Sequence, residues 1–481
     1  MTDSLNSQAA KGVSWAFIET ASVYTVRFVV GIILARLLFP SDFGLIGMIT
    51  IFISISDVFV NAGFGQAFIQ KKDATRQDAN TVFAINFTLG LFVYAILFFA
   101  APLIADFFNK PILASLVRAL TIVVLINSLN VIQHAMIRKD LQFKKRAILT
   151  VSSSAVSGGI GIAFAYNGFG VWSLVIQQLC NRGILCLLLY IFSKWHLVFS
   201  FSKASAKAMF SFGGWTLLSN LMLSIMNNIY RFSIGKLYSA TELGLYERAR
   251  QFEAMISDTF TWMFGVVAFP VFSKIQNETD RLKATTYNFI FYSTLMIYPV
   301  ITCLLIVAKP FVVLIITEKW LPSVPYLQLL CIVGLITPVN YFISPLLQSI
   351  GEARKVFFYT IFIGILRIIN IFVASHWGIR GIIIGETIVL SLSTCLMSLY
   401  MKRLIGFKYL AVLSRMKWIV LAVIVAGIAA KFTLTTLDEC HNLIQVVIPC
   451  MVLLIIYAGI MLIFERQNTL KILSVIQSKG R

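Results

Sequence analysis

The chain has 481 residues, of which 59% are hydrophobic and only 12% are charged. Soluble globular domains usually carry about 25% charged residues, so this sequence has too little polar surface to fold as one in water. The 40 Lys and Arg residues exceed the 20 Asp and Glu residues, but these cations are spread along the chain without a binding motif, which argues against a nucleic-acid partner.

Long apolar runs follow one another with short connections between them. Each run is long enough to cross a hydrocarbon core of about 30 Å as a helix, and the runs do not alternate polar and apolar positions as strands of a water-filled barrel would. We therefore predict an all-α integral membrane protein with about fourteen transmembrane helices. The predicted spans are 13–36, 42–69, 80–105, 112–136, 147–166, 170–193, 208–235, 242–272, 285–308, 323–349, 355–375, 379–401, 417–437 and 443–464.

The turn between the first two spans is repeated later in the chain. Residues Ala35–Leu45 recur 200 positions further on as Gly235–Leu245. For the turn alone, chance is the alternative, because many turns between apolar helices contain a Gly and an acidic residue. Matches at three separate places without a gap favour a duplicated unit. The identical positions are Leu37/Leu237, Gly44/Gly244, Leu45/Leu245, Trp15/Trp215 and Phe64-Gly65/Phe264-Gly265.

This duplication predicts two six-helix lobes. An even number of spans in each copy gives both copies the same orientation, so the repeat is parallel and its pseudo-twofold axis runs along the membrane normal. We assign residues 1–193 to an N-lobe and residues 208–401 to a C-lobe. Residues 194–207 form a cytoplasmic linker whose aromatic residues and cations predict a position at the membrane interface. Residues 402–481 add two helices and a cytoplasmic tail.

The distribution of cations predicts the orientation of the chain. The N-terminus and every second connection after it together contain 26 Lys and Arg residues, against 7 in the other connections. The remaining cations are arginines inside the predicted spans. Because cytoplasmic loops carry the excess of Lys and Arg, both termini are predicted to be cytoplasmic.

Arginines inside the spans are candidates for a substrate site. A charged side chain at the bilayer centre costs at least about 2.5 kcal/mol, so these arginines should face the protein interior or a watery cavity. A guanidinium holds phosphate oxygens through two parallel hydrogen bonds, which a lysine cannot do. We therefore predict a cationic cavity that binds an anion. The candidate binding residues are Arg27, Arg182, Arg231, Arg248, Arg250 and Arg367.

Structural pairing is the alternative for each of these arginines. Arg250 lies three positions from both Glu247 and Glu253 and can pair within its own helix, while Arg231 can extend its charge to the headgroups. Acidic residues inside the spans are candidates for ion coupling, and interhelical salt bridges are their alternative role. The candidate ion-coupling residues are Asp57, Glu386 and Glu19.

No motif indicates catalysis, a cofactor or a metal. The seven cysteines are scattered without a CxxC pair, so we predict neither a disulfide framework nor a metal site. The connections between spans are too short for a folded extramembrane domain. These features argue against an enzyme.

Four stretches carry a resemblance to a known family. They are Ala35–Leu45, Asn61–Lys72, Phe269–Gln276 and Glu318–Leu330. On these stretches the chain resembles the polysaccharide-transporter branch of the multidrug/oligosaccharidyl-lipid/polysaccharide exporter (MOP) superfamily. It is most similar to the bacterial Wzx-type flippases, which include colanic-acid and O-antigen exporters.

The resemblance implies a multi-pass protein of the bacterial inner membrane, with both termini in the cytoplasm. Such a protein moves an undecaprenyl-pyrophosphate-linked oligosaccharide from the inner to the outer leaflet by alternating access. The expected partners are this polyprenyl-linked glycan, membrane lipids and polysaccharide polymerase or assembly proteins, and the expected oligomeric state is a monomer.

Two other classes of function remain as alternatives. A multidrug or organic-cation antiporter of the same superfamily would share the fold, but its ligand would favour acids over a set of arginines. A membrane glycosyltransferase or polymerase would be an enzyme, and it would normally carry catalytic residues on a large extramembrane loop.

Overall fold

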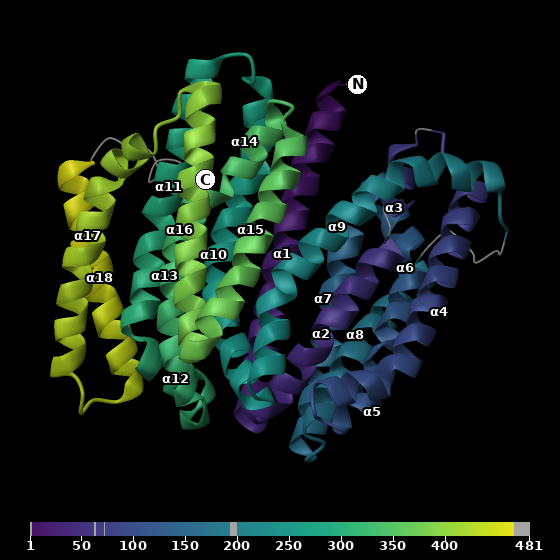
Figure 1. Cartoon of the computed structure of the whole chain (residues 1–481), viewed down its shortest axis with the longest axis horizontal. Coiled ribbons are helices and arrows are strands. Elements are labelled where there is room, and N and C mark those ends of the chain that lie inside the picture. The colour runs from purple at the N-terminus through teal and green to yellow at the C-terminus, as the bar shows by residue number, and fades with distance from the viewer. Residues whose placement is uncertain (1, 62–63, 72, 193–199, 466–481) are drawn as a thin grey trace. The chain divides into compact units, whose positions relative to one another are not determined.

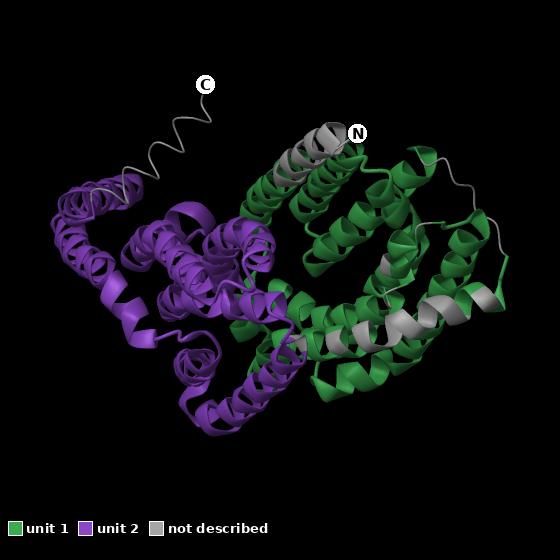
Figure 2. Ribbon diagram, turned by 90° about the horizontal axis from the view of Figure 1, so that it is seen from above, with its two compact units in different colours: residues 1–244 green, residues 245–481 purple. Residues whose placement is uncertain are grey.

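The computed structural model describes residues 2–61, 64–71, 73–192 and 200–465, and every secondary-structure element within these ranges is a helix (Figure 1). The chain divides after Gly244 into two compact units (Figure 2). In the described residues, 12 helical stretches are long and apolar enough to cross a membrane. The chain is therefore a multi-pass membrane protein, as its composition predicts, while the number of fourteen spans stays a prediction.

Unit 1 comprises residues 1–244. The predicted span 42–69 is divided between α2 and α3, and the predicted span 112–136 is divided between α5 and α6, which meet at Thr121. The helices of this unit are α1 (Thr2–Leu37), α2 (Pro40–Asn61), α3 (Phe64–Gln70), α4 (Arg76–Phe107), α5 (Ile112–Leu120), α6 (Ile122–Lys139), α7 (Phe143–Tyr166), α8 (Val171–Phe192) and α9 (Lys203–Leu237).

Small residues bring the helices of unit 1 close together. α7 packs against both α1 and α8, and α6 packs against α2, α4 and α8. A Cβ atom added to Gly158 of α7 would overlap Val30 of α1, and one added to Gly161 would come within 2.8 Å of Gln177 of α8. Glycine and serine are common at helix interfaces in membranes, because packing there depends on close approach rather than on the hydrophobic effect.

Unit 2 comprises residues 245–481 and contains most of α10. Its buried apolar core is built mainly from α10, α11, α14, α16, α17 and α18. α12 was not predicted, because nine residues are too few to span a bilayer. The helices are α10 (Ala240–Lys274), α11 (Thr279–Ile306), α12 (Ala308–Ile316), η1 (Glu318–Ser323), α13 (Val324–Tyr341), α14 (Ile343–Ser349), α15 (Ala353–Ala374), η2 (Ser375–Trp377), α16 (Gly378–Ile405), α17 (Tyr409–Thr436) and α18 (Asn442–Phe464).

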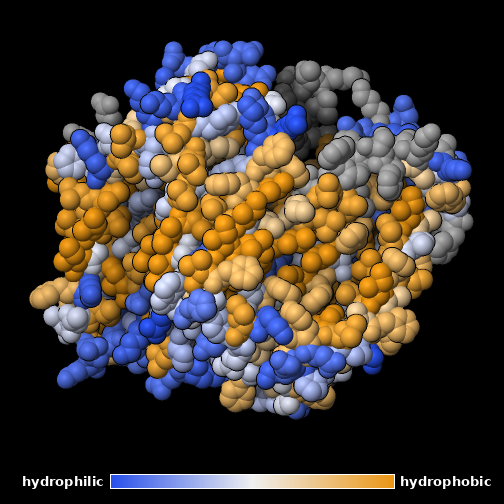
Figure 3. Space-filling view, viewed as in Figure 1, coloured by the Kyte–Doolittle hydropathy of each residue, from blue (hydrophilic) through white to orange (hydrophobic). Residues whose placement is uncertain are grey.

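The outer surface of α15 and α16 is apolar over most of its length. Phe358, Ile365 and Phe372 of α15 and Ile388 of α16 are exposed, and Figure 3 shows apolar side chains covering the middle of these helices and hydrophilic ones gathering near their ends. Exposed apolar area of this extent is unfavourable in water and suits contact with lipid.

The repeated turn has the same helix boundaries in both copies. A two-residue break separates α1 from α2, and another separates α9 from α10 at the equivalent position. The two turns also contact each other: a Cβ atom on Gly44 would overlap the carbonyl oxygen of Ala240, and one on Gly244 would overlap that of Pro40. Such a reciprocal contact between equivalent positions is what a local twofold axis produces. The two lobes and their boundaries at 193 and 208 stay predictions.

Two predicted cytoplasmic segments fall partly or wholly outside the described residues. Of the linker 194–207, the part before Ser200 is not described. Ser200 and Ser202 lie next to the start of α4, where Asn80 donates to the Ser200 hydroxyl and the Ser202 backbone N–H donates to Thr81 Oγ1, both at 3.1 Å. The C-terminal tail 466–481 also lies outside the described residues.

Candidate functional site

Unit 1 contains a polar pocket with a volume of about 460 Å³. Its lining comes from α1, α2, α3, α6, α7, α8 and α9. α6 contributes a row of side chains at intervals of three or four positions, which places them along one face of the helix. That row is Asn127, Asn130, Val131, His134, Ala135 and Arg138.

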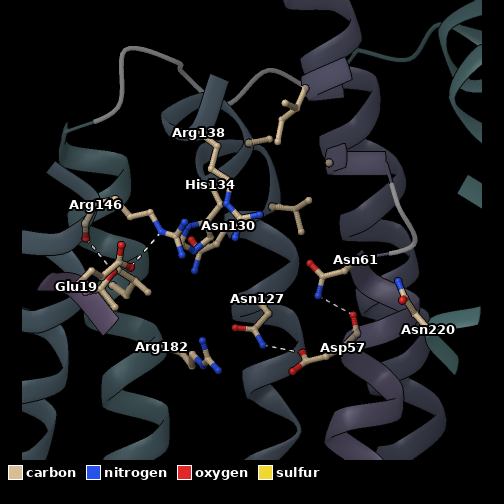
Figure 4. A pocket seen from close by; sticks show the side chains of 16 residues that line it. Glu19, Asp57, Asn61, Asn127, Asn130, His134, Arg138, Arg146, Arg182 and Asn220 are labelled. Atoms are coloured by element: carbon tan, nitrogen blue, oxygen red, sulfur yellow. Dashed lines mark hydrogen bonds and ion pairs between the residues drawn. The ribbon is translucent and has the colours of Figure 1, made fainter. Parts of the chain in front are cut away.

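Cationic side chains gather on one side of this pocket (Figure 4). Arg146 comes from α7, Arg182 from α8 and Arg138 from the last turn of α6. Arg146 forms an ion pair with Glu19 of α1, with Nε and Oε1 3.2 Å apart. Glu19 therefore offsets part of the charge of Arg146, and Arg138 and Arg182 have no ion pair with a described acidic residue.

Asp57, Asn61 and Asn220 line the other side of the pocket, and Asn127 points towards Asp57 (Figure 4). Asp57 accepts a hydrogen bond of 2.7 Å from Asn127 Nδ2 at its carboxylate and one of 2.7 Å from Asn61 Nδ2 at its backbone carbonyl oxygen. Asn130 is buried, and its Oδ1 has no hydrogen-bond partner. Asn220 of α9 completes this side.

The structure brings three of the predicted site residues together in this pocket. Arg182, Asp57 and Glu19 all line it. Arg27 lies on α1, close enough to Arg182 for their charges to interact. Arg231 of α9 is not among the lining residues, and it donates a hydrogen bond of 3.0 Å to Asn228 Oδ1 of the same helix.

The other predicted residues lie in unit 2, on α10, α15 and α16. Arg250 forms an ion pair with Glu253 at 3.1 Å, as the spacing of three residues predicted. Arg248 is buried, with its guanidinium 5.3 Å from the ring centre of Trp320, which is within the range of a cation–π interaction. Glu386 is buried and interacts electrostatically with Arg250, and Arg367 is half-buried on α15. Their roles in substrate binding or ion coupling stay predictions.

Sequence reasoning missed several lining residues. Arg138 and Arg146 were counted as loop cations, because they lie at the ends of predicted spans. A stripe of polar residues on α6, from Asn127 through Asn130 and His134 to Arg138, is the signal that could have found this side of the pocket. The described residues include no group of three or more His, Cys, Asp or Glu side chains placed to hold a metal ion.

Curated relatives of this chain act in the synthesis or transport of several bacterial polysaccharides. It is 27% identical over 414 residues to the lipopolysaccharide biosynthesis protein WzxC of Escherichia coli, an alignment covering 84% of this chain and 83% of the relative. It is 29% identical over 378 residues to the teichuronic acid biosynthesis protein TuaB of Bacillus subtilis, covering 78% of each. It is 24% identical over 370 residues to the succinoglycan biosynthesis transport protein ExoT of Rhizobium meliloti, covering 75% of this chain and 73% of the relative.

Solved structures of transporters share the fold. The lipid II flippase MurJ in an inward closed conformation matches with a TM-score of 0.76 at 14% identity, over 95% of this chain and 99% of that one. An inward-facing multidrug resistance MATE family transporter of the MOP superfamily matches with a TM-score of 0.63 at 18% identity, over 80% of this chain and 94% of that one. These matches confirm the all-α transporter fold.

The family itself is shown by a profile match that covers more than half of the chain. Residues 33–325 match the family described as "Polysaccharide biosynthesis protein". This match agrees with the relatives and confirms the resemblance to polysaccharide exporters indicated by the sequence motifs. The chain belongs to the polysaccharide biosynthesis protein family.

Proposed function

We propose that this protein is a flippase of the bacterial inner membrane. It moves an undecaprenyl-pyrophosphate-linked oligosaccharide, the repeat unit of a polysaccharide, from the inner to the outer leaflet by alternating access. The observation that carries this proposal is the pocket of unit 1, whose lining combines three arginines, Arg138, Arg146 and Arg182, with four asparagines. Relatives named for different polysaccharides support the substrate class.

The pocket suits a diphosphate joined to a sugar. Arginine forks bind phosphate oxygens through charge-assisted hydrogen bonds, which offset the cost of taking the anion out of water. The polyprenyl tail can stay in the lipid while the polar head crosses through the protein. Movement of this kind makes and breaks no covalent bond, so the function is transport rather than catalysis.

An organic-cation exporter fits the pocket less well, although the MATE transporter shares the fold. Three arginines outnumber the two carboxylates, Asp57 and Glu19, and Glu19 is already paired with Arg146. A cationic ligand would be repelled from this side of the pocket. The chemistry of the lining therefore favours an anionic substrate.

Replacement of Arg182 tests the proposal. A strain that lacks this protein should accumulate lipid-linked repeat units on the cytoplasmic side, and the wild-type chain should restore export. Arg182→Ala should abolish that rescue, because it removes the fork for phosphate oxygens, and Arg182→Lys should restore only part of it, because it keeps the charge alone. Mass spectrometry of the accumulated lipid-linked glycans measures each outcome.

Arg118→Ala provides the matched control. Arg118 is also an arginine of unit 1, within the stretch Ile112–Lys139 that is long and apolar enough to cross a membrane, but it lies outside the pocket, with its guanidinium 4.8 Å from the ring centre of Phe98. This variant should support normal export. Normal export by Arg182→Ala, at wild-type levels of inserted protein, would refute the role of the pocket.

A further inference from the structure

We infer that the asparagine side of the unit 1 pocket recognises the sugar attached directly to the pyrophosphate, and that it selects a neutral sugar over an acidic one. This inference rests on the proposed function, because the cationic side of the same pocket must hold the pyrophosphate. It assigns a second subsite to residues on α2, α6 and α9, formed by Asp57, Asn61, Asn127, Asn130 and Asn220.

The helices separate the two subsites. Arg146 and Arg182 come from α7 and α8, which pack against each other, whereas Asp57 and Asn220 come from α2 and α9, which also pack against each other. α6 lies between the two groups and contacts both α2 and α8. Figure 4 shows the resulting separation, with Arg146 and Arg182 on one side and Asp57, Asn61 and Asn220 on the other.

The lining face of α6 connects the two subsites. Along this face, Asn127 and Asn130 are followed by His134 and then by Arg138, so the lining changes from amide side chains to a cationic one. At 1.5 Å per residue this row extends about 16 Å. The pocket volume of about 460 Å³ is near the lower end of the range for small-molecule sites, ~300–1,000 Å³. The pocket therefore suits a diphosphate with its adjoining sugar rather than a whole oligosaccharide.

Hydrogen bonds determine which way two of the amides point. Asn127 Nδ2 donates to the Asp57 carboxylate and Asn61 Nδ2 donates to the Asp57 backbone carbonyl oxygen, so both side chains turn their NH₂ groups towards Asp57. This orientation leaves their side-chain carbonyl oxygens as acceptors for a ligand. Asn130 adds a buried Oδ1 without a partner, and such an atom is costly unless a ligand or water binds it.

The subsite is consequently rich in acceptors. Three amide oxygens and the carboxylate of Asp57 suit the hydroxyl and N-acetyl N–H donors of a neutral sugar. The carboxylate of a uronic acid would instead meet Asp57 and acceptor oxygens, and that contact is repulsive. The subsite can thus supply affinity for a neutral sugar and reject an acidic one.

Binding of three related ligands to the purified full-length chain tests this inference. The ligands are farnesyl diphosphate, farnesyl diphospho-glucose and farnesyl diphospho-glucuronic acid, with affinity measured in lipid nanodiscs. We expect glucose to raise the affinity about tenfold over the bare diphosphate, which is the effect of one or two buried hydrogen bonds. The glucuronic acid compound should bind no better than the bare diphosphate.

Variants of the asparagines should change the binding of the sugar and leave the binding of the diphosphate unchanged. Asn130→Leu keeps the branched shape of the side chain and removes its hydrogen bonds, so it should lower the affinity for the glucose compound about five- to tenfold and leave bare farnesyl diphosphate unchanged. Asn61→Ala provides a second variant at an exposed position, in case Asn130→Leu fails to fold. Asp57→Asn should raise the affinity for the glucuronic acid compound. Asn167→Leu is the matched control, since Asn167 lies outside the pocket and donates only to Ala163 in the hydrogen bonds of the described residues.

The same measurements separate this inference from the proposed function. Arg182→Ala should weaken the binding of all three ligands. If Arg182→Ala leaves all three unchanged, the proposed function of the pocket fails. If Arg182→Ala weakens all three but glucose adds no affinity, or Asn130→Leu and Asn61→Ala weaken all three equally, only the sugar subsite is refuted.

Discussion

The ion pair between Arg250 and Glu253 shows how one helix can carry charges inside the membrane-spanning part of the chain. The two residues are three positions apart on α10, and the Glu253 side chain is only 2% exposed. Ser257, a further turn along, donates a hydrogen bond to the other carboxylate oxygen of Glu253. A buried pair of this kind is favourable only while both partners are present, because either charge alone would be desolvated without compensation.

Removal of Arg250 should therefore destabilise the protein strongly. Arg250→Ala leaves the Glu253 carboxylate buried without its partner, at a cost of about 3–5 kcal/mol, whereas Arg250→Ala combined with Glu253→Gln should recover part of that loss. The melting temperature of the detergent-solubilised protein measures both effects.

Arg281→Ala is the control for this prediction. Arg281 forms an ion pair of the same spacing with Glu278 at 3.2 Å, but both side chains are more than half exposed. Exposed pairs contribute little to stability, so the melting temperature should hardly change. Equal effects of Arg250→Ala and Arg281→Ala would contradict a stabilising role for the buried pair.

At the scale of the elements, the repeated turn is recognisable both in the sequence and in the structure. α2 and the start of α10 approach so closely at this turn that backbone atoms occupy the space of a side chain at both Gly44 and Gly244. Glycine is required here for lack of space, since neither residue has a positive φ angle. A glycine therefore occupies the equivalent position of each turn, where it makes room for a backbone oxygen of the other turn.

Gly44→Val should disrupt this contact. Overfilling a packed site costs typically about 1–3 kcal/mol, and the cost should be at the upper end here because the obstructing atom is a backbone oxygen rather than a flexible side chain. We expect a lower melting temperature and less protein in the membrane. Gly159→Val on α7 is the matched control, because a Cβ atom there would meet no atom within 4 Å. Similar melting temperatures for the two variants would show that the close contact is dispensable.

For the whole molecule, the distribution of Lys and Arg predicts the orientation in the membrane. The connection between α17 and α18 belongs to the set with few cations, and the connection between α10 and α11 belongs to the set with many. The first is therefore expected outside the cytoplasm and the second inside it. Cys440 and Arg281 are exposed on these two connections or at their edges.

Cysteine labelling tests this orientation. In a chain whose other cysteines are replaced by Ser, Cys440 should react with a membrane-impermeant maleimide in intact spheroplasts. With Cys440 also replaced, Arg281→Cys should react only after the membrane is permeabilised. The opposite pattern would reverse the orientation, and labelling of both sites in intact spheroplasts would mean that the number of spans between them is even.

The amino-acid sequence by itself determined the membrane setting, the approximate limits of the long helices and the position of the repeated turn. These features depend on local properties, namely the length of apolar runs and the identity of residues at a fixed spacing. It also identified Arg182, Asp57 and Glu19 as charges that need an interior environment. Only the tertiary structure decided that these three share one pocket and that Arg250 does not belong to it. The reason is physical: hydropathy indicates which residues leave the lipid, whereas the packing of α2 and α9 on one side and α7 and α8 on the other decides which polar side chains meet.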